Sequence, residues 1–133
     1  MATRPSEHWR DGVAEEAREL AAGTIGPECA FMARLFPESL LAATDRVTAS
    51  FEAEVRAMGG PCDGEVLAAV EHVVLALNAV NEEHGGGGYE TDEREELCRY
   101  IDLTLAEHGI DVPALAARGG IGPDGVTDRW REW

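Results

Sequence analysis

Lysine is absent from this chain of 133 residues. The chain has eleven arginines and twenty-six aspartates and glutamates, so its formal net charge is −15. Proteins that bind nucleic acid without sequence preference neutralise its phosphates with clustered lysines and arginines. Anionic membrane surfaces attract basic segments in the same way. We therefore expect neither nucleic acid nor a membrane among the partners of this chain.

Long hydrophobic runs and paired cysteines are absent as well. No apolar run approaches the ~20 residues that span a bilayer, and the first eight residues lack the apolar stretch of a signal peptide, which together predict a cytoplasmic protein. Cys29, Cys62 and Cys98 are too far apart for a disulfide framework or a close-spaced zinc motif, and we expect them to be reduced. The use of arginine alone, with abundant alanine and glycine, is typical of a GC-rich genome; a halophilic source is the alternative.

Helical periodicity dominates the middle of the chain. Apolar residues recur at spacings of three, four or seven in residues 37–58 and 63–84, and again in residues 91–108, where Leu97, Ile101 and Leu105 form one face. Weaker patterns predict flanking helices at 6–22, 28–36 and 111–118. Short connections make neighbouring helices antiparallel. The sequence predicts a single all-α domain: a small antiparallel helical bundle with a central three-helix core and short flanking helices.

Helix ends and the aromatic end of the chain give more local expectations. Asp63 and Asp111 are placed to act as N-caps, and residues 28–36 carry apolar side chains that we expect to cap the core. A last helical turn after Thr127 would place Trp130 and Trp133 on one face. Indoles are seldom left in water, so we expect this pair to dock on its own bundle or to insert into a second copy or a partner.

Acidic residues are concentrated in residues 82–96, where seven acids and one arginine give a charge of −6. One interpretation is a solvated helix start, where the helix dipole favours acids. The other is a docking surface for a basic protein, because complementary charge speeds association and sets specificity. We call these seven residues the acidic cluster: Glu82, Glu83, Glu90, Asp92, Glu93, Glu95 and Glu96.

Two polar side chains continue the apolar stripe of the second core helix. On a helical wheel, Asn81 and His84 fall close to the direction of Val66, and His84 is expected near Glu93 or the turn before it. With Glu90 or Glu93 they would form a hydrogen-bonded pocket, a general base site or a weak divalent metal site. The simpler interpretation is that the helix has emerged from the core, with His84 favourably placed at the negative end of its dipole.

Familiar catalytic signatures are missing. The glycines at 85–88 follow a helix, lack the Gly-Lys-Ser/Thr of a P-loop, and are most simply a flexible connection. A GxSxG elbow, an HExxH motif, an EF-hand loop and a dinucleotide fingerprint are also missing. We assign no catalytic residue and no cofactor, and we expect a protein that is not an enzyme.

The stretch Leu77-Asn-Ala-Val-Asn-Glu-Glu-His84, the glycine-rich turn and Tyr89-Glu-Thr-Asp-Glu-Arg-Glu-Glu-Leu97 resemble small acidic helical proteins of actinobacteria and other bacteria without an assigned function. The resemblance covers residues 36–108 and implies an all-helical fold but no site. Our hypothesis is an interaction protein that binds a basic protein, or a second copy, through the acidic cluster and the C-terminal aromatics. An antidote or immunity-type protein is one such case. The alternative is a small enzyme or metal-binding protein that uses Asn81, His84 and a nearby glutamate.

Overall fold

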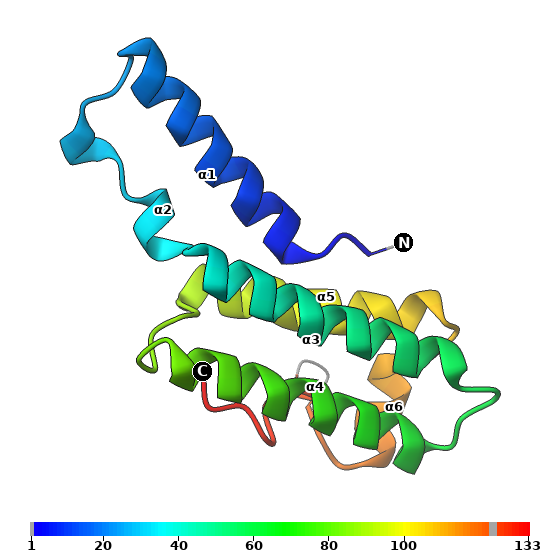
Figure 1. Ribbon diagram of the computed structural model, residues 1–133. Helices are drawn as coiled ribbons and strands as arrows, with labels where there is room; N and C mark the ends of the chain where they lie inside the picture. The colour runs from blue at the N-terminus through cyan, green and yellow to red at the C-terminus, as the bar shows by residue number, and fades with distance from the viewer. Residues whose placement is uncertain (1, 123–124) are drawn as a thin grey trace.

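The computed structural model describes residues 2–122 and 125–133 (Figure 1). Its elements in chain order are α1 (Pro5–Ala22), the 3-10 turn η1 (Pro27–Cys29), α2 (Met32–Leu35), α3 (Glu38–Ala57), α4 (Asp63–Glu83), α5 (Thr91–Glu107) and α6 (Val112–Arg118). All regular structure in the described residues is helical, which confirms the predicted fold class of a small helical bundle.

The core lies between α3, α4 and α5. The helices α3 and α4 form an antiparallel hairpin with the most extensive contact in the molecule, and α5 runs beside α3 (Figure 1). Helical spacing places the buried side chains on one face of each helix, including Leu40 and Phe51 of α3, Val70 and Leu77 of α4, and Ile101 of α5. Burial of this apolar surface is the main stabilising contribution to the fold.

The last segment of the chain, residues 125–133, completes the core; we call it the tail. It runs back along α4 without forming a helix (Figure 1), so the expected helical turn after Thr127 is wrong. The Asn78 amide of α4 holds it at two points: Nδ2 donates to the Trp130 carbonyl at 2.7 Å, and Oδ1 accepts from the Glu132 amide at 2.9 Å. The tail therefore places Trp133 in the core, 6% exposed, and leaves Trp130 half-buried.

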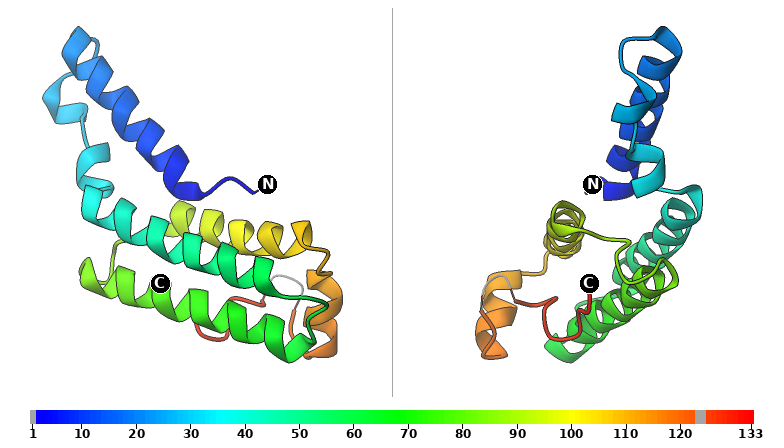
Figure 2. Two further views of the ribbon diagram at one scale, coloured as in Figure 1. Left: turned by 45° about the vertical axis from the view of Figure 1, so that its right-hand side comes forward. Right: turned by 90° about the vertical axis from the view of Figure 1, so that its left-hand side faces the viewer.

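The helix α1 and the short elements after it project from the bundle as a hairpin (Figure 2). None of the residues 10–35 is buried, and we call this segment the arm. The predicted helix 28–36 is divided into η1 and α2, and Met32 of α2 is partly buried against the core. Of its apolar residues only Phe36 is buried, whereas Phe31 and Leu35 are 53% and 38% exposed, so the expectation that all of them cap the core is wrong.

The first turn of α1 is fixed to α3 by charge. The Arg4 guanidinium donates two hydrogen bonds of 2.9 Å to the carboxylate of Glu52, which also accepts from the Tyr100 hydroxyl. Glu52 is buried, and the hydrogen bonds from Arg4 hold its pKa below its usual range. Arg10 likewise contacts Glu38 and Asp45, each at 2.7 Å. These pairs anchor one end of the arm.

The two predicted N-caps have different outcomes. Asp111 caps α6, since its Oδ1 accepts from the Ala114 amide at 3.0 Å, which confirms the expectation. Asp63 is instead the first residue inside α4, where it makes no cap hydrogen bond. Its carboxylate pairs with Arg118 at 2.6 Å and joins the start of α4 to the end of α6.

In the part of the chain that the structure describes, no helix has the length and apolar character that a membrane span requires.

Candidate interaction surface

The acidic cluster lies at one end of the bundle, around the turn where α4 ends and α5 begins (Figure 1). Its exposed members are Glu82, Glu83, Glu90, Asp92 and Glu95. Among the described residues, none of the seven carboxylates forms an ion pair with an arginine. Arg94, the one cation within the window, donates to the Thr91 hydroxyl at 3.1 Å. The field of the cluster is therefore directed outward without a neutralising partner.

Two members of the cluster, Glu93 and Glu96, are half-buried beside α1 and α2. The carboxylate of Glu96 accepts a hydrogen bond of 2.8 Å from the indole Nε1 of Trp9. Burial raises the pKa of Glu93, and the neighbouring charges of Glu96 and Glu90 add to this shift, although backbone amides at the helix start oppose it. Part of the acidic cluster is thus built into a contact between α5 and α1.

A groove of about 270 Å³ lies between α1, α2 and the start of α5. One side is apolar and the other is acidic. Its floor includes Trp9, which is 2% exposed and stacks on Phe36 with ring centroids 5.3 Å apart. The full lining is His8, Trp9, Gly12, Phe31, Met32, Leu35, Phe36, Asp92, Glu93 and Glu96. The groove places exposed apolar side chains of the arm beside unpaired carboxylates of the cluster.

Asn81 organises the glycine-rich turn. Its side chain is buried, with Nδ2 donating to the Gly86 carbonyl at 3.2 Å and Oδ1 accepting from the Tyr89 amide at 2.9 Å. Gly85 and Gly86 have φ of 82° and 77°, in the left-handed region that favours glycine. These contacts give the turn a defined conformation and place the Tyr89 ring in the core.

His84 lies against α3 and beside Gly88, in the turn that precedes Glu93, which is one of the two places expected for it. Its Nδ1 lies 2.8 Å from the Val80 carbonyl and must donate to it, which leaves Nε2 of the neutral ring to accept from the Ser39 hydroxyl at 3.1 Å. Both nitrogens therefore have partners within the chain, although the contact with Ser39 is exposed. Within residues 2–122 and 125–133, no three His, Cys, Asp or Glu side chains are grouped closely enough to hold a metal ion. His72 is exposed, and its Nδ1 lies 2.8 Å from Glu54 Oε1.

Aromatic rings from four segments form a continuous chain of contacts. Phe36 stacks on Trp9, Trp9 lies 6.0 Å from Tyr89, and Tyr89 meets Trp133 edge to face at 5.8 Å, all between ring centroids. Burial raises the pKa of Tyr89 to about 12. Its hydroxyl donates to Thr44 at 2.6 Å, because the Thr44 hydroxyl itself donates to the Leu40 carbonyl. The chain connects the arm, the glycine-rich turn and the tail.

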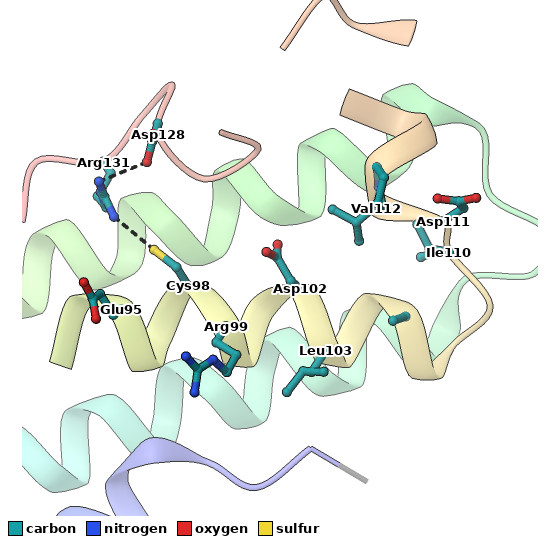
Figure 3. A pocket seen from close by; sticks show the side chains of 12 residues that line it. Glu95, Cys98, Arg99, Asp102, Leu103, Ile110, Asp111, Val112, Asp128 and Arg131 are labelled. Atoms are coloured by element: carbon teal, nitrogen blue, oxygen red, sulfur yellow. Dashed lines mark hydrogen bonds and ion pairs between the residues drawn. The ribbon is translucent and has the colours of Figure 1, made fainter. Parts of the chain in front are cut away.

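A larger pocket lies elsewhere, between α5, the start of α6 and the tail (Figure 3). Its volume is about 860 Å³. On its wall the Cys98 Sγ accepts from Arg131 Nη1 at 3.0 Å and from the Thr127 hydroxyl at 3.3 Å, and Arg131 also pairs with Asp128 at 3.0 Å. These contacts hold the tail against α5. The other lining groups carry both signs of charge, including Glu95, Arg99, Asp102 and Asp111.

Comparison of the chain with protein-family models, with curated proteins and with solved structures finds no significant match. The resemblance to small acidic bacterial proteins therefore stays a prediction. The geometry of the described residues is the basis for the function proposed below.

Sequence reasoning missed three residues that shape this surface. Trp9 lies in a weakly patterned helix, and its partners are 27 or more residues away in the sequence. Asn78 lies on a polar flank of α4, and its bond to the tail joins residues 52 positions apart. Glu52 lies on a helix with regular apolar spacing. Its burial and its pair with Arg4 are visible only in the folded structure. The contacts of these three residues join segments far apart in the sequence, so no fixed spacing could have revealed them.

Proposed function

We propose that this chain is a protein-interaction module, not an enzyme, and that its acidic cluster binds a basic protein. The observation that carries the proposal is the exposed set of carboxylates at the α4–α5 turn, which lacks arginine partners in the described part of the chain. Such a surface attracts cationic proteins over about a Debye length and orients them before contact. An antidote that covers a basic toxin is one form of this function.

The internal contacts of Asn81 and His84 support a structural role for these residues over catalysis. The Asn81 amide spans the glycine-rich turn, and the His84 ring joins α4 to α3. A general base needs a ring nitrogen that faces a substrate. The alternative function, a small enzyme or metal-binding protein built on Asn81, His84 and Glu93, therefore has less support.

Self-association is the second interaction to consider. Two copies would bring together net charges of −15 each, and the acidic clusters would repel one another. The tryptophans that favoured a second copy at the sequence level, Trp130 and Trp133, contact the core of their own chain. A basic partner is the better fit to both observations.

The test compares two charge-neutralised variants. One replaces Glu83, Glu90 and Glu95 with glutamine, and the matched control does the same at Glu7, Glu65 and Glu132; all six side chains are exposed. The variants have equal net charge, so only the position of the charge differs. The immobilised chain is challenged with basic proteins separated from a bacterial lysate by cation exchange. We expect salt-sensitive binding that the first variant loses and the control retains. Equal loss in both, or binding that salt does not weaken, contradicts the proposal.

A further inference from the structure

The groove between the arm and α5 combines three features that occur together nowhere else among the described residues: exposed aromatic and aliphatic side chains, a buried aromatic floor and carboxylates without arginine partners. Phe31 and Leu35 stand on the arm, which projects from the bundle (Figure 2). Exposed apolar side chains grouped beside a groove mark interaction sites more often than scattered ones do.

We propose that this groove is the docking site for an amphipathic helix of a basic partner protein, with one large apolar side chain inserted between Phe31, Leu35 and Trp9 and with lysine or arginine set against Asp92 and Glu93. The proposal rests on the proposed function and specifies it, because it adds an apolar anchor and a geometry to the attraction between charges.

The size of the groove favours a side chain over a small molecule. Its volume of about 270 Å³ is below the range of roughly 300–1,000 Å³ that is usual for small-molecule pockets. A phenylalanine or leucine side chain is smaller than this volume and fits within it. An anchor of this kind, enclosed by apolar walls, is typical of the residues that dominate binding energy at protein interfaces.

The neighbouring elements favour a helix as the occupant. The walls of the groove are helical, and the described residues contain no strand whose edge an extended peptide could join. A helix placed in a groove between helices presents anchors at every third or fourth position. Such a segment gives one face to Phe31 and Leu35 and leaves its flanks for charged contacts with α5.

The charges at the groove favour a basic occupant. Asp92 and Glu93 begin α5, and neither pairs with an arginine in the described structure. Glu96 is engaged by Trp9 and so holds the floor in place. Burial makes the charged form of Glu93 costly, and a cation from the partner would relieve this cost. A second copy of the chain brings further negative charge and offers no such relief.

The experiment uses the full chain and two synthetic peptides of about 18 residues, long enough to form a helix. Both contain the same leucines, lysines and alanines. In the first, the leucines recur at helical spacing on one face; in the second, they are spread around the helix. Isothermal titration calorimetry at low salt gives the two affinities. We expect the amphipathic peptide to bind at least about tenfold more tightly, which corresponds to about 1.4 kcal/mol.

Variants then locate the site. Replacing Phe31 and Leu35 with serine should weaken the amphipathic peptide by about tenfold or more. The matched control replaces Leu75 and Leu103, which are 46% and 48% exposed and lie outside the groove, and should change the affinity less than about twofold. All four side chains are exposed, so each variant should fold. Changing Asp92 to Asn and Glu93 to Gln should weaken both the affinity and its dependence on salt.

The outcomes separate this inference from the proposed function. Equal affinity for the two peptides, or equal losses in the groove and control variants, overturns the docking site and leaves the acidic surface intact. Failure of both peptides to bind at low salt overturns both proposals. Light scattering that shows a dimer, abolished by the Phe31 and Leu35 replacements, would assign the groove to a second copy and overturn the basic helix as its occupant.

Discussion

The indole Nε1 of Trp9 donates a hydrogen bond of 2.8 Å to the carboxylate of Glu96, and this bond joins α1 to α5 across 87 positions of the sequence. The same indole stacks on Phe36. One side chain therefore fixes the arm relative to the acidic cluster. The position of the groove depends on this contact.

Replacing Trp9 with phenylalanine should lower the free energy of unfolding by about 1–2 kcal/mol, because the hydrogen bond is lost and the smaller ring leaves space beside Phe36. Urea denaturation measures this change. Glu96→Gln is the control, since its amide oxygen still accepts from the indole, and it should cost much less. A larger loss in Glu96→Gln than in Trp9→Phe would show that the charge of Glu96 matters more than the indole, and would contradict this account.

Acid should destabilise the protein through Glu52. Hydrogen bonds from Arg4 lower the pKa of this carboxyl in the folded state below its ordinary value of 4.5. The stabilisation is complete above that value and is lost as the pH falls through the lower folded pKa. Glu52→Gln should cost about 1–3 kcal/mol at pH 7, because it removes the charged partner of a part-buried pair, and should make the dependence on pH below 4.5 shallower. If the free energy of unfolding of the original chain and of Glu52→Gln depended on pH in the same way, this account would be contradicted.

Glu93 should have the opposite effect on stability. Burial raises its pKa in the folded state, so its charged form opposes folding above the ordinary value. Glu93→Gln, which resembles the protonated form, should therefore raise the melting temperature at pH 7 slightly. Glu95→Gln, at an exposed position, is the control and should leave it nearly unchanged. Carboxylates that lower stability are common at binding sites. A fall in the melting temperature of Glu93→Gln would remove this support for the groove as a binding site.

The glycine-rich turn should depend on Asn81. Asn81→Ala removes two hydrogen bonds and leaves the buried amide of Tyr89 without an acceptor, so we expect a loss of about 2–3 kcal/mol in the free energy of unfolding. Chemical denaturation gives the value. Asn78→Ala is the comparison: it should cost less overall but should expose the Glu132 amide to hydrogen exchange, because Asn78 Oδ1 is its acceptor. If the Glu132 amide of Asn78→Ala exchanged at the unchanged rate, the proposed role of Asn78 in fixing the tail would be contradicted.

The sequence was sufficient for the core because the relevant signals are local. Apolar spacing on α4 identifies Val66, Val70 and Leu77 as one face, and all three are buried. Asp111 was recognised as a cap because its partner is three residues away. The same reasoning placed Asp63 at a cap position, but its ion pair with Arg118, 55 residues away, lies outside any local pattern.

The candidate site was only partly predictable for the same reason. The acidic cluster is contiguous in the sequence, so its charge could be counted in advance. The groove requires the arm to cross the start of α5, and that crossing depends on Trp9, Phe36 and Arg4 meeting distant partners. The tail likewise follows Asn78 and Cys98 rather than its own helical tendency.

The chain of rings from Phe36 through Trp9 and Tyr89 to Trp133 also has an optical consequence. Tyr89 lies within 6.0 Å of one indole and 5.8 Å of the other, so its excitation energy should pass to both. Because Trp9 forms the floor of the groove, a ligand seated there would change the emission spectrum without any added label. The fold thus contains its own fluorescent reporter of occupancy.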